Sequence, residues 1–148
     1  MSEETLRGVW TPQQRALMFI GFAADQVRDL LPFVTGEQSI EPAAVEAACK
    51  ESFVLNVRLI IDFLTRGKPR VDILAKDYAP EWQPDEKLKE RLDRWHELAS
   101  RHAMHLSRER VPDDMRDVEP VSPEDYRQMA NDCEEALTSF RAAAAKRA

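Results

Sequence analysis

The sequence predicts an all-α fold, an antiparallel four-helix bundle formed by one domain that spans residues 1–148. Only 4 glycines occur among the 148 residues, which favours long helices over a turn-rich sheet. Four segments are rich in apolar residues at helical spacing, and three of them repeat these residues at regular steps of three and four, the spacing of an amphipathic helix. Proline and capping residues stand where these segments begin. The spacing and the boundary signals together predict helices over 12–31, 42–66, 84–107 and 123–145.

The first predicted helix, 12–31, begins with a capping signal. Thr11 is a good N-cap residue, Pro12 suits the first helical position, and Gln14 can return a hydrogen bond to the cap. Pro32 marks the expected end of this helix, because proline lacks the backbone N–H that a helix interior requires. The segment is expected to form one wall of the bundle.

The second predicted helix, 42–66, is the most apolar segment of the chain and is expected to lie at the centre of the bundle. Proline at its start and Gly67 just past its end fit the usual helix boundaries. One wide face is apolar, and Ala48, Leu55 and Leu59 extend the apolar surface round most of the circumference. Arg58 and Asp62 share a narrow charged edge, one turn apart.

The remaining chain supplies a packed loop and two more helices. Residues 68–83 contain Ile73, Tyr78 and Trp82 among prolines and charges, and are expected to pack over one end of the bundle. The third helix, 84–107, places His102 at a position that the periodicity assigns to the core. The fourth, 123–145, starts at a capping serine, Ser122.

Composition narrows the classes of function. The formal net charge of −6 disfavours non-specific nucleic-acid binding, although a local basic face remains compatible with it. No apolar run reaches eighteen residues, and the first residues lack the layout of a signal peptide, so we expect a cytoplasmic protein that does not enter a membrane. No phosphate-binding glycine loop, nucleophile elbow or paired-cysteine motif is present, and no cofactor is predicted.

The candidate catalytic residues are His105 and Arg101 on the third helix with Arg58 and Asp62 on the second. Such a set supplies a titratable imidazole, cations for an anionic substrate and a carboxylate that orients the ring. It suits attack on a phosphodiester, where a base activates a ribose hydroxyl and arginines stabilise the developing charge. His96 falls on the opposite flank of the third helix and is not part of this set.

Simpler interpretations of the same residues remain open. His102 and Asn56 are candidate binding residues, but they can equally form a hydrogen-bonded pair in the core. Arg58 and Asp62 can be an ion pair one helical turn apart. A metal would require His102 and His105 together with carboxylates from another helix, and no metal ligand is predicted.

Two segments carry a family resemblance. SRHAMHLSRER, preceded by NVRLIIDFL in the central helix, resembles small bacterial all-helical proteins that are similar to the HEPN superfamily, in its abortive-infection-like branch. The resemblance implies a four-helix bundle, a homodimer and RNA as a partner, with His105 as the motif histidine. The HEPN ribonucleases place the motif arginine further from this histidine than Arg101 stands here.

Three functional interpretations follow. The first is a HEPN-like binding or regulatory module, dimeric and without strong catalysis, which is favoured by the shifted arginine. The second is a metal-independent endoribonuclease that uses His105 with Arg101 or Arg58. The third is a helical bundle that binds a metal or a small molecule.

Overall fold

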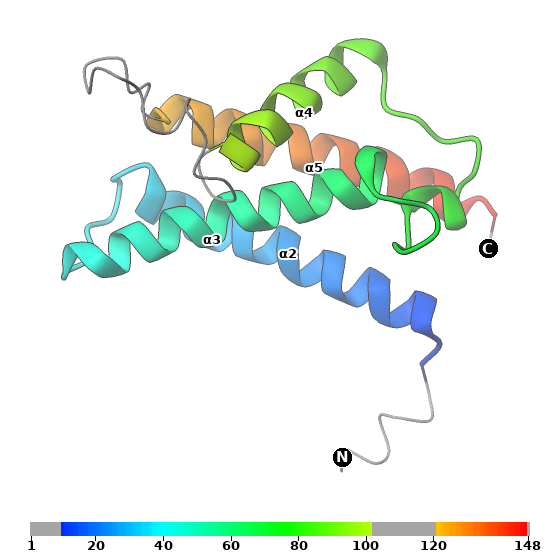
Figure 1. Cartoon of the computed structure of the whole chain (residues 1–148), viewed down its shortest axis with the longest axis horizontal. Helices are drawn as coiled ribbons and strands as arrows, with labels where there is room; N and C mark the ends of the chain where they lie inside the picture. The colour runs from blue at the N-terminus through cyan, green and yellow to red at the C-terminus, as the bar shows by residue number, and fades with distance from the viewer. Residues whose placement is uncertain (1–9, 102–120, 148) are drawn as a thin grey trace.

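The computed structural model describes residues 10–101 and 121–147. Within these ranges the chain forms four α-helices and no strand, which confirms the predicted all-α class: α2 (Pro12–Val34), α3 (Ala43–Ile61), α4 (Glu86–Ala99) and α5 (Pro123–Ala145). A π-helical turn, Asp62–Arg66, continues α3, and a short 3-10 turn spans Ala75–Asp77. Successive helices run in opposite directions (Figure 1).

The capping signal of α2 forms as predicted. Thr11 Oγ1 accepts a hydrogen bond from the Gln14 backbone N–H at 3.1 Å, and Gln14 Oε1 accepts one from the Thr11 N–H at 2.8 Å. The predicted end was wrong, because the helix passes Pro32 and reaches Val34. A proline this close to the C-terminus interrupts little of the hydrogen-bond ladder. The Thr35 N–H still reaches the Leu31 carbonyl at 3.1 Å.

The α-helical part of α3 is shorter than the predicted 42–66. Pro42 is the N-cap rather than the first helical residue, and the α-helix ends at Ile61. From there the backbone widens into the π-turn, in which the Gly67 N–H donates to the Asp62 carbonyl at 2.6 Å. Phe63 in this turn is buried, and its ring packs edge-on against Phe140 of α5, with 5.3 Å between the ring centroids.

The start of α4 also differs from the prediction, whereas α5 matches it. The helix begins at Glu86 rather than residue 84, because the Asp85 carboxylate accepts the Leu88 N–H at 2.9 Å and so caps the helix. It ends at Ala99, and the predicted extension over 102–107 lies outside the described residues. In α5, Ser122 caps the helix over the predicted range 123–145.

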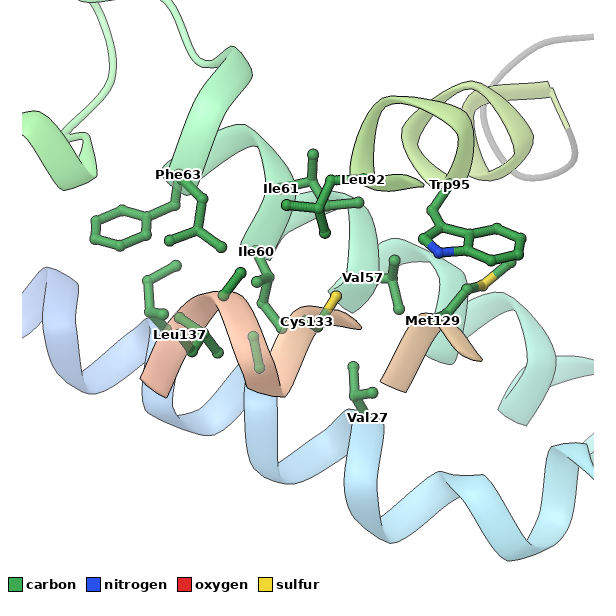
Figure 2. Packing of buried hydrophobic residues seen from close by; sticks show 14 of the residues in the cluster. Val27, Val57, Ile60, Ile61, Phe63, Leu92, Trp95, Met129, Cys133 and Leu137 are labelled. Atoms are coloured by element: carbon green, nitrogen blue, oxygen red, sulfur yellow. The ribbon is translucent and has the colours of Figure 1, made fainter. Parts of the chain in front are cut away.

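The position of α3 organises the core, as the sequence predicted. It contacts α2, α4 and α5, and its largest shared interface within the described residues is with α2. α4 and α2 lie on opposite sides of it (Figure 1). Figure 2 shows Ile61 of α3 beside Leu92 of α4, while Ile60 lies toward Cys133 and Leu137 of α5. All five of these side chains are buried.

The loop that joins α3 to α4 packs over one end of the bundle, as predicted. The Tyr78 hydroxyl donates to the Gln13 carbonyl of α2 at 2.6 Å. The Trp82 indole N–H donates to Ser139 Oγ of α5 at 3.0 Å. Both aromatic rings pack against Phe140. The loop therefore ties α2 to α5 at the end where α3 widens.

Across residues 10–101 and 121–147, no helix combines the length with the apolar character that crossing a membrane requires.

Candidate functional site

The interface between α3 and α4 holds a histidine–carboxylate pair. Asp62 Oδ1 lies 2.8 Å from His96 Nε2. Asp62 is the first residue of the π-turn, and His96 lies in the last turn of α4. The His96 side chain is only 12% exposed, whereas that of Asp62 is 37% exposed. The carboxylate thus fixes the orientation of an imidazole that is largely covered by the bundle.

Arg58 joins the same carboxylate from the preceding turn of α3. Its Nε lies 3.6 Å from Asp62 Oδ2, so that Asp62 faces a guanidinium with one oxygen and an imidazole with the other. The predicted Arg58–Asp62 ion pair is confirmed. Arg58 Nη1 is buried and has no hydrogen-bond partner in the described part of the chain. A buried donor without an acceptor is costly, and an oxygen from a ligand would relieve that cost.

The three residues, Arg58, Asp62 and His96, form what we call the α3–α4 cluster. It contains the elements that the sequence analysis assigned to a composite site, namely an imidazole, a carboxylate that orients it and a cation. The histidine is His96, which the sequence analysis left out. The charged edge of α3 therefore meets His96 of α4. The expected contact of this edge with His105 stays a prediction, because His105 lies outside the described residues.

Other predicted site residues are placed only in part. His102 and His105 lie outside the described residues. Arg101 is half-buried directly after α4. Asn56 donates its side-chain N–H to the Ser52 carbonyl at 2.8 Å, within its own helix. The structure brings Arg58 and Asp62 together, and it adds His96 to them.

A second ion-paired group lies next to the α3–α4 cluster, and the two groups together form what we call the polar seam. Arg66 at the end of the π-turn lies 3.3 Å from Asp93 Oδ1, and Lys89 lies 2.8 Å from Asp93 Oδ2. Partial burial raises the pKa of Asp93, but hydrogen bonds and charges from Lys89 and Arg66 outweigh it, and the net pKa is lowered. The seam joins the π-turn to α4 at two levels, through Asp62 with His96 and through Arg66 with Asp93.

This complementarity is the signal that the sequence analysis missed. Arg58 of α3 and Asp62 and Arg66 of the π-turn follow one another at steps of four, while Lys89, Asp93 and His96 share one flank of α4. Matching charges on two flanks predict that the flanks face each other. The apolar stripe of α4 alone did not decide this, because it leaves open which flank turns toward α3.

A cavity lies beside the seam, where the π-turn, the loop and the start of α4 meet. Its volume is about 240 Å³, and Phe63, Trp82, Lys76 and Lys89 are among the residues that line it. This volume is smaller than the roughly 300–1,000 Å³ of most small-molecule sites. Among the described residues no group of three or more His, Cys, Asp or Glu side chains is placed to hold a metal ion.

Comparison with known proteins does not add to this picture. No protein-family model, curated protein or solved structure matches the chain.

Proposed function

We propose that this protein is a HEPN-like helical binding module that recognises an anionic, phosphate-bearing ligand at the α3–α4 cluster, with RNA as the ligand class. The observation that carries the proposal is Arg58 Nη1, a donor without a hydrogen-bond acceptor within residues 10–101 and 121–147, on a side chain that is 26% exposed. A guanidinium presents several N–H donors in a planar fork, the geometry that phosphate oxygens accept best.

The surroundings of Arg58 favour binding over strong catalysis. Asp62 uses both carboxylate oxygens, one toward Arg58 and one toward His96. The imidazole is largely covered, and its Nε2 faces Asp62 rather than a substrate. A general base must reach the proton that it removes, and an imidazole held in this way is better suited to positioning its neighbours.

The resemblance to the HEPN superfamily supports the choice of RNA and adds self-association to the proposal. Because the formal net charge of −6 opposes non-specific attraction to a polyanion, binding would depend on a local site rather than on the overall charge. Removing the Arg58 side chain should therefore weaken RNA binding more than removing another arginine does.

Fluorescence anisotropy with a labelled single-stranded RNA tests the proposal. Arg58→Gln should raise the Kd by about tenfold or more, since a hydrogen bond to a charged group contributes about 1.5–3 kcal/mol. Arg28→Gln is the matched control, because it removes the same charge from an exposed position on α2. Equal effects of the two changes, with both variants folded by circular dichroism, would contradict a site at Arg58.

The Asp62–His96 pair supports a second candidate function, a metal-independent endoribonuclease. A carboxylate-oriented imidazole beside an arginine is the arrangement that activation of a ribose hydroxyl requires. In this version the base is either His96 through its Nδ1, since Asp62 holds its Nε2, or His105 with Arg101 or Arg58. The purified protein is incubated with total RNA in the presence of a chelator. Cleavage that is lost in His96→Ala or His105→Ala supports this function, and intact RNA with the native protein excludes it.

A further inference from the structure

The cavity beside the polar seam has an apolar interior and a cationic mouth, which the proposed function does not use. Phe63, Leu64 and Leu74 line the cavity and are buried, so they form its inner wall. Lys76 and Lys89 also line it but are exposed, so they stand where it opens to solvent. The cavity can therefore take an apolar group out of water while an anionic group stays at the surface.

The mouth of the cavity is positively charged, although the whole chain carries a net charge of −6. Among the described residues that line the cavity, two are lysines and none is Asp or Glu. Lys76 makes no ion pair within residues 10–101 and 121–147. Lys89 and Arg66 share the single carboxylate of Asp93, at 2.8 and 3.3 Å, so this group keeps one positive charge. The charge at the mouth thus favours an anion.

The carboxylates of the loop between α3 and α4 are used to fold the loop itself. Asp72 accepts a hydrogen bond from the Lys68 backbone N–H at 2.6 Å, and Asp77 accepts one from the Leu74 N–H at 2.7 Å. Neither carboxylate lines the cavity. Because backbone donors hold these two groups, the lysines at the mouth remain available to a ligand.

One wall of the cavity is formed by the π-turn, to which Phe63, Leu64 and Thr65 belong. Single π-turns are rare, and they frequently stand at functional sites. The loop lies close against this turn, since a Cβ on Gly67 would overlap Leu74 Cδ2. The turn and the loop are therefore packed tightly together, and the shape of the cavity between them is set by the fold before a ligand arrives.

The volume of the cavity limits the ligand to a single ring with a short polar group. A cavity of about 150 Å³ is large enough for benzene, and this one has about 240 Å³. The lining includes the aromatic rings of Phe63 and Trp82, which pack well against another aromatic ring. Size, aromatic walls and a cationic mouth together define a small aromatic carboxylate.

We propose that this cavity is a binding site for a small aromatic carboxylate, whose ring lies against Phe63 and Trp82 and whose carboxylate meets Lys76 and Lys89. The site shares no residue with the α3–α4 cluster, so Arg58→Gln should leave its affinity unchanged. Failure of RNA binding and failure of this proposal are thus separate results.

Isothermal titration calorimetry with phenylacetate tests the ligand class. The native chain should bind it with a Kd of about 1 mM or lower. Phenylacetamide has the same ring without the charge and should bind about threefold more weakly. Lys76→Gln should remove this preference for the acid. Lys68→Gln is the matched control, because Lys68 is an exposed lysine of the same loop that does not line the cavity, and it should keep the preference.

Two results of the titration would overturn the proposal. One is the absence of binding by the folded native chain at several millimolar phenylacetate. The other is equal affinity for the acid and the amide, which would show that the lysines at the mouth do not select an anion.

Methyl NMR spectroscopy locates the bound probe. The Leu64 and Leu74 methyl signals should shift when phenylacetate is added, because both side chains line the cavity. Leu137 is the control, since it lines a smaller cavity of about 140 Å³ at the junction of α2 and α5. Shifts at Leu137 without shifts at Leu64 and Leu74 would place the ligand in that other cavity and would contradict the proposal.

Discussion

The indole N–H of Trp95 donates a hydrogen bond of 2.8 Å to Asp132 Oδ2, and this bond ties α4 to α5 inside the core. Asp132 Oδ1 accepts two further bonds of 3.1 Å each, from Arg91 Nε and from Gln128 Nε2. The Asp132 side chain is only 1% exposed. A buried carboxylate is tolerated here because each of its oxygens has a donor.

Asp132→Ala should lower the free energy of unfolding by about 3 kcal/mol, because it leaves the Trp95 N–H buried without an acceptor. Urea denaturation measures the change. Glu135→Ala is the control, since Glu135 contacts the same Arg91 at 3.6 Å but is 57% exposed, and it should cost no more than about 0.5 kcal/mol. Similar losses in the two variants would show that Asp132 acts only through surface charge.

Gly67→Ala should destabilise the protein by about 1–3 kcal/mol, the usual cost of overpacking a filled site. A Cβ at this position would overlap Leu74 Cδ2 and would lie 2.8 Å from the Asp62 carbonyl oxygen. Gly21→Ala is the control, because a Cβ there meets nothing within 4 Å. In the middle of α2 that change should stabilise by about 0.5–1 kcal/mol. Thermal unfolding of the two variants should therefore shift in opposite directions.

The Asp93 group predicts a pH dependence of stability. The folded pKa of Asp93 is lowered, so the unfolded chain takes up a proton first as the pH falls. The stabilisation by Asp93 should be complete above the unfolded value of about 3.9, and should disappear as the pH drops through the lower folded value. Asp93→Asn should thus unfold at a lower temperature than the native chain at pH 7. The difference in unfolding temperature between the two proteins should disappear toward strongly acid pH. A difference that does not change with pH would contradict this prediction.

Cys133 should resist alkylation in the folded protein. Burial, with a smaller effect from Asp132, raises the pKa of the Cys133 thiol to about 12, so almost none of it is thiolate at pH 8. Iodoacetamide followed by mass spectrometry of peptides should label Cys49, which is half-buried, before Cys133. Denaturant should make the two thiols equally reactive. Early labelling of native Cys133 would show that α5 opens locally.

Local signals in the sequence predicted most of the helical framework. The capping box at Thr11 and the cap at Ser122 involve residues three apart, so their geometry follows from the sequence itself. The position of α3 among the other helices followed from its wide apolar surface. The end of α2 beyond Pro32 could not be predicted in this way, because a proline signal does not specify how many further residues remain helical.

The candidate site was harder to predict, because it depends on contacts between distant segments. His96 and Asp62 are 34 residues apart, and which flank of α4 meets α3 depends on how the two helices pack. The π-turn could not be predicted either, because it does not change the apolar pattern of the sequence. It begins at Asp62 and sets the position of Phe63. The buried Asp132 has the same origin, since its Arg91 and Trp95 partners stand on another helix.

The exposure of Leu55 and Leu59 on a helix whose opposite face is fully buried has a consequence for mutational tolerance. Because the core does not depend on that side of α3, α3 has a tolerant side, as α5 has. In a library of single substitutions, both helices should then show a helical period of tolerated positions, and Leu55 and Leu59 should be among those of α3.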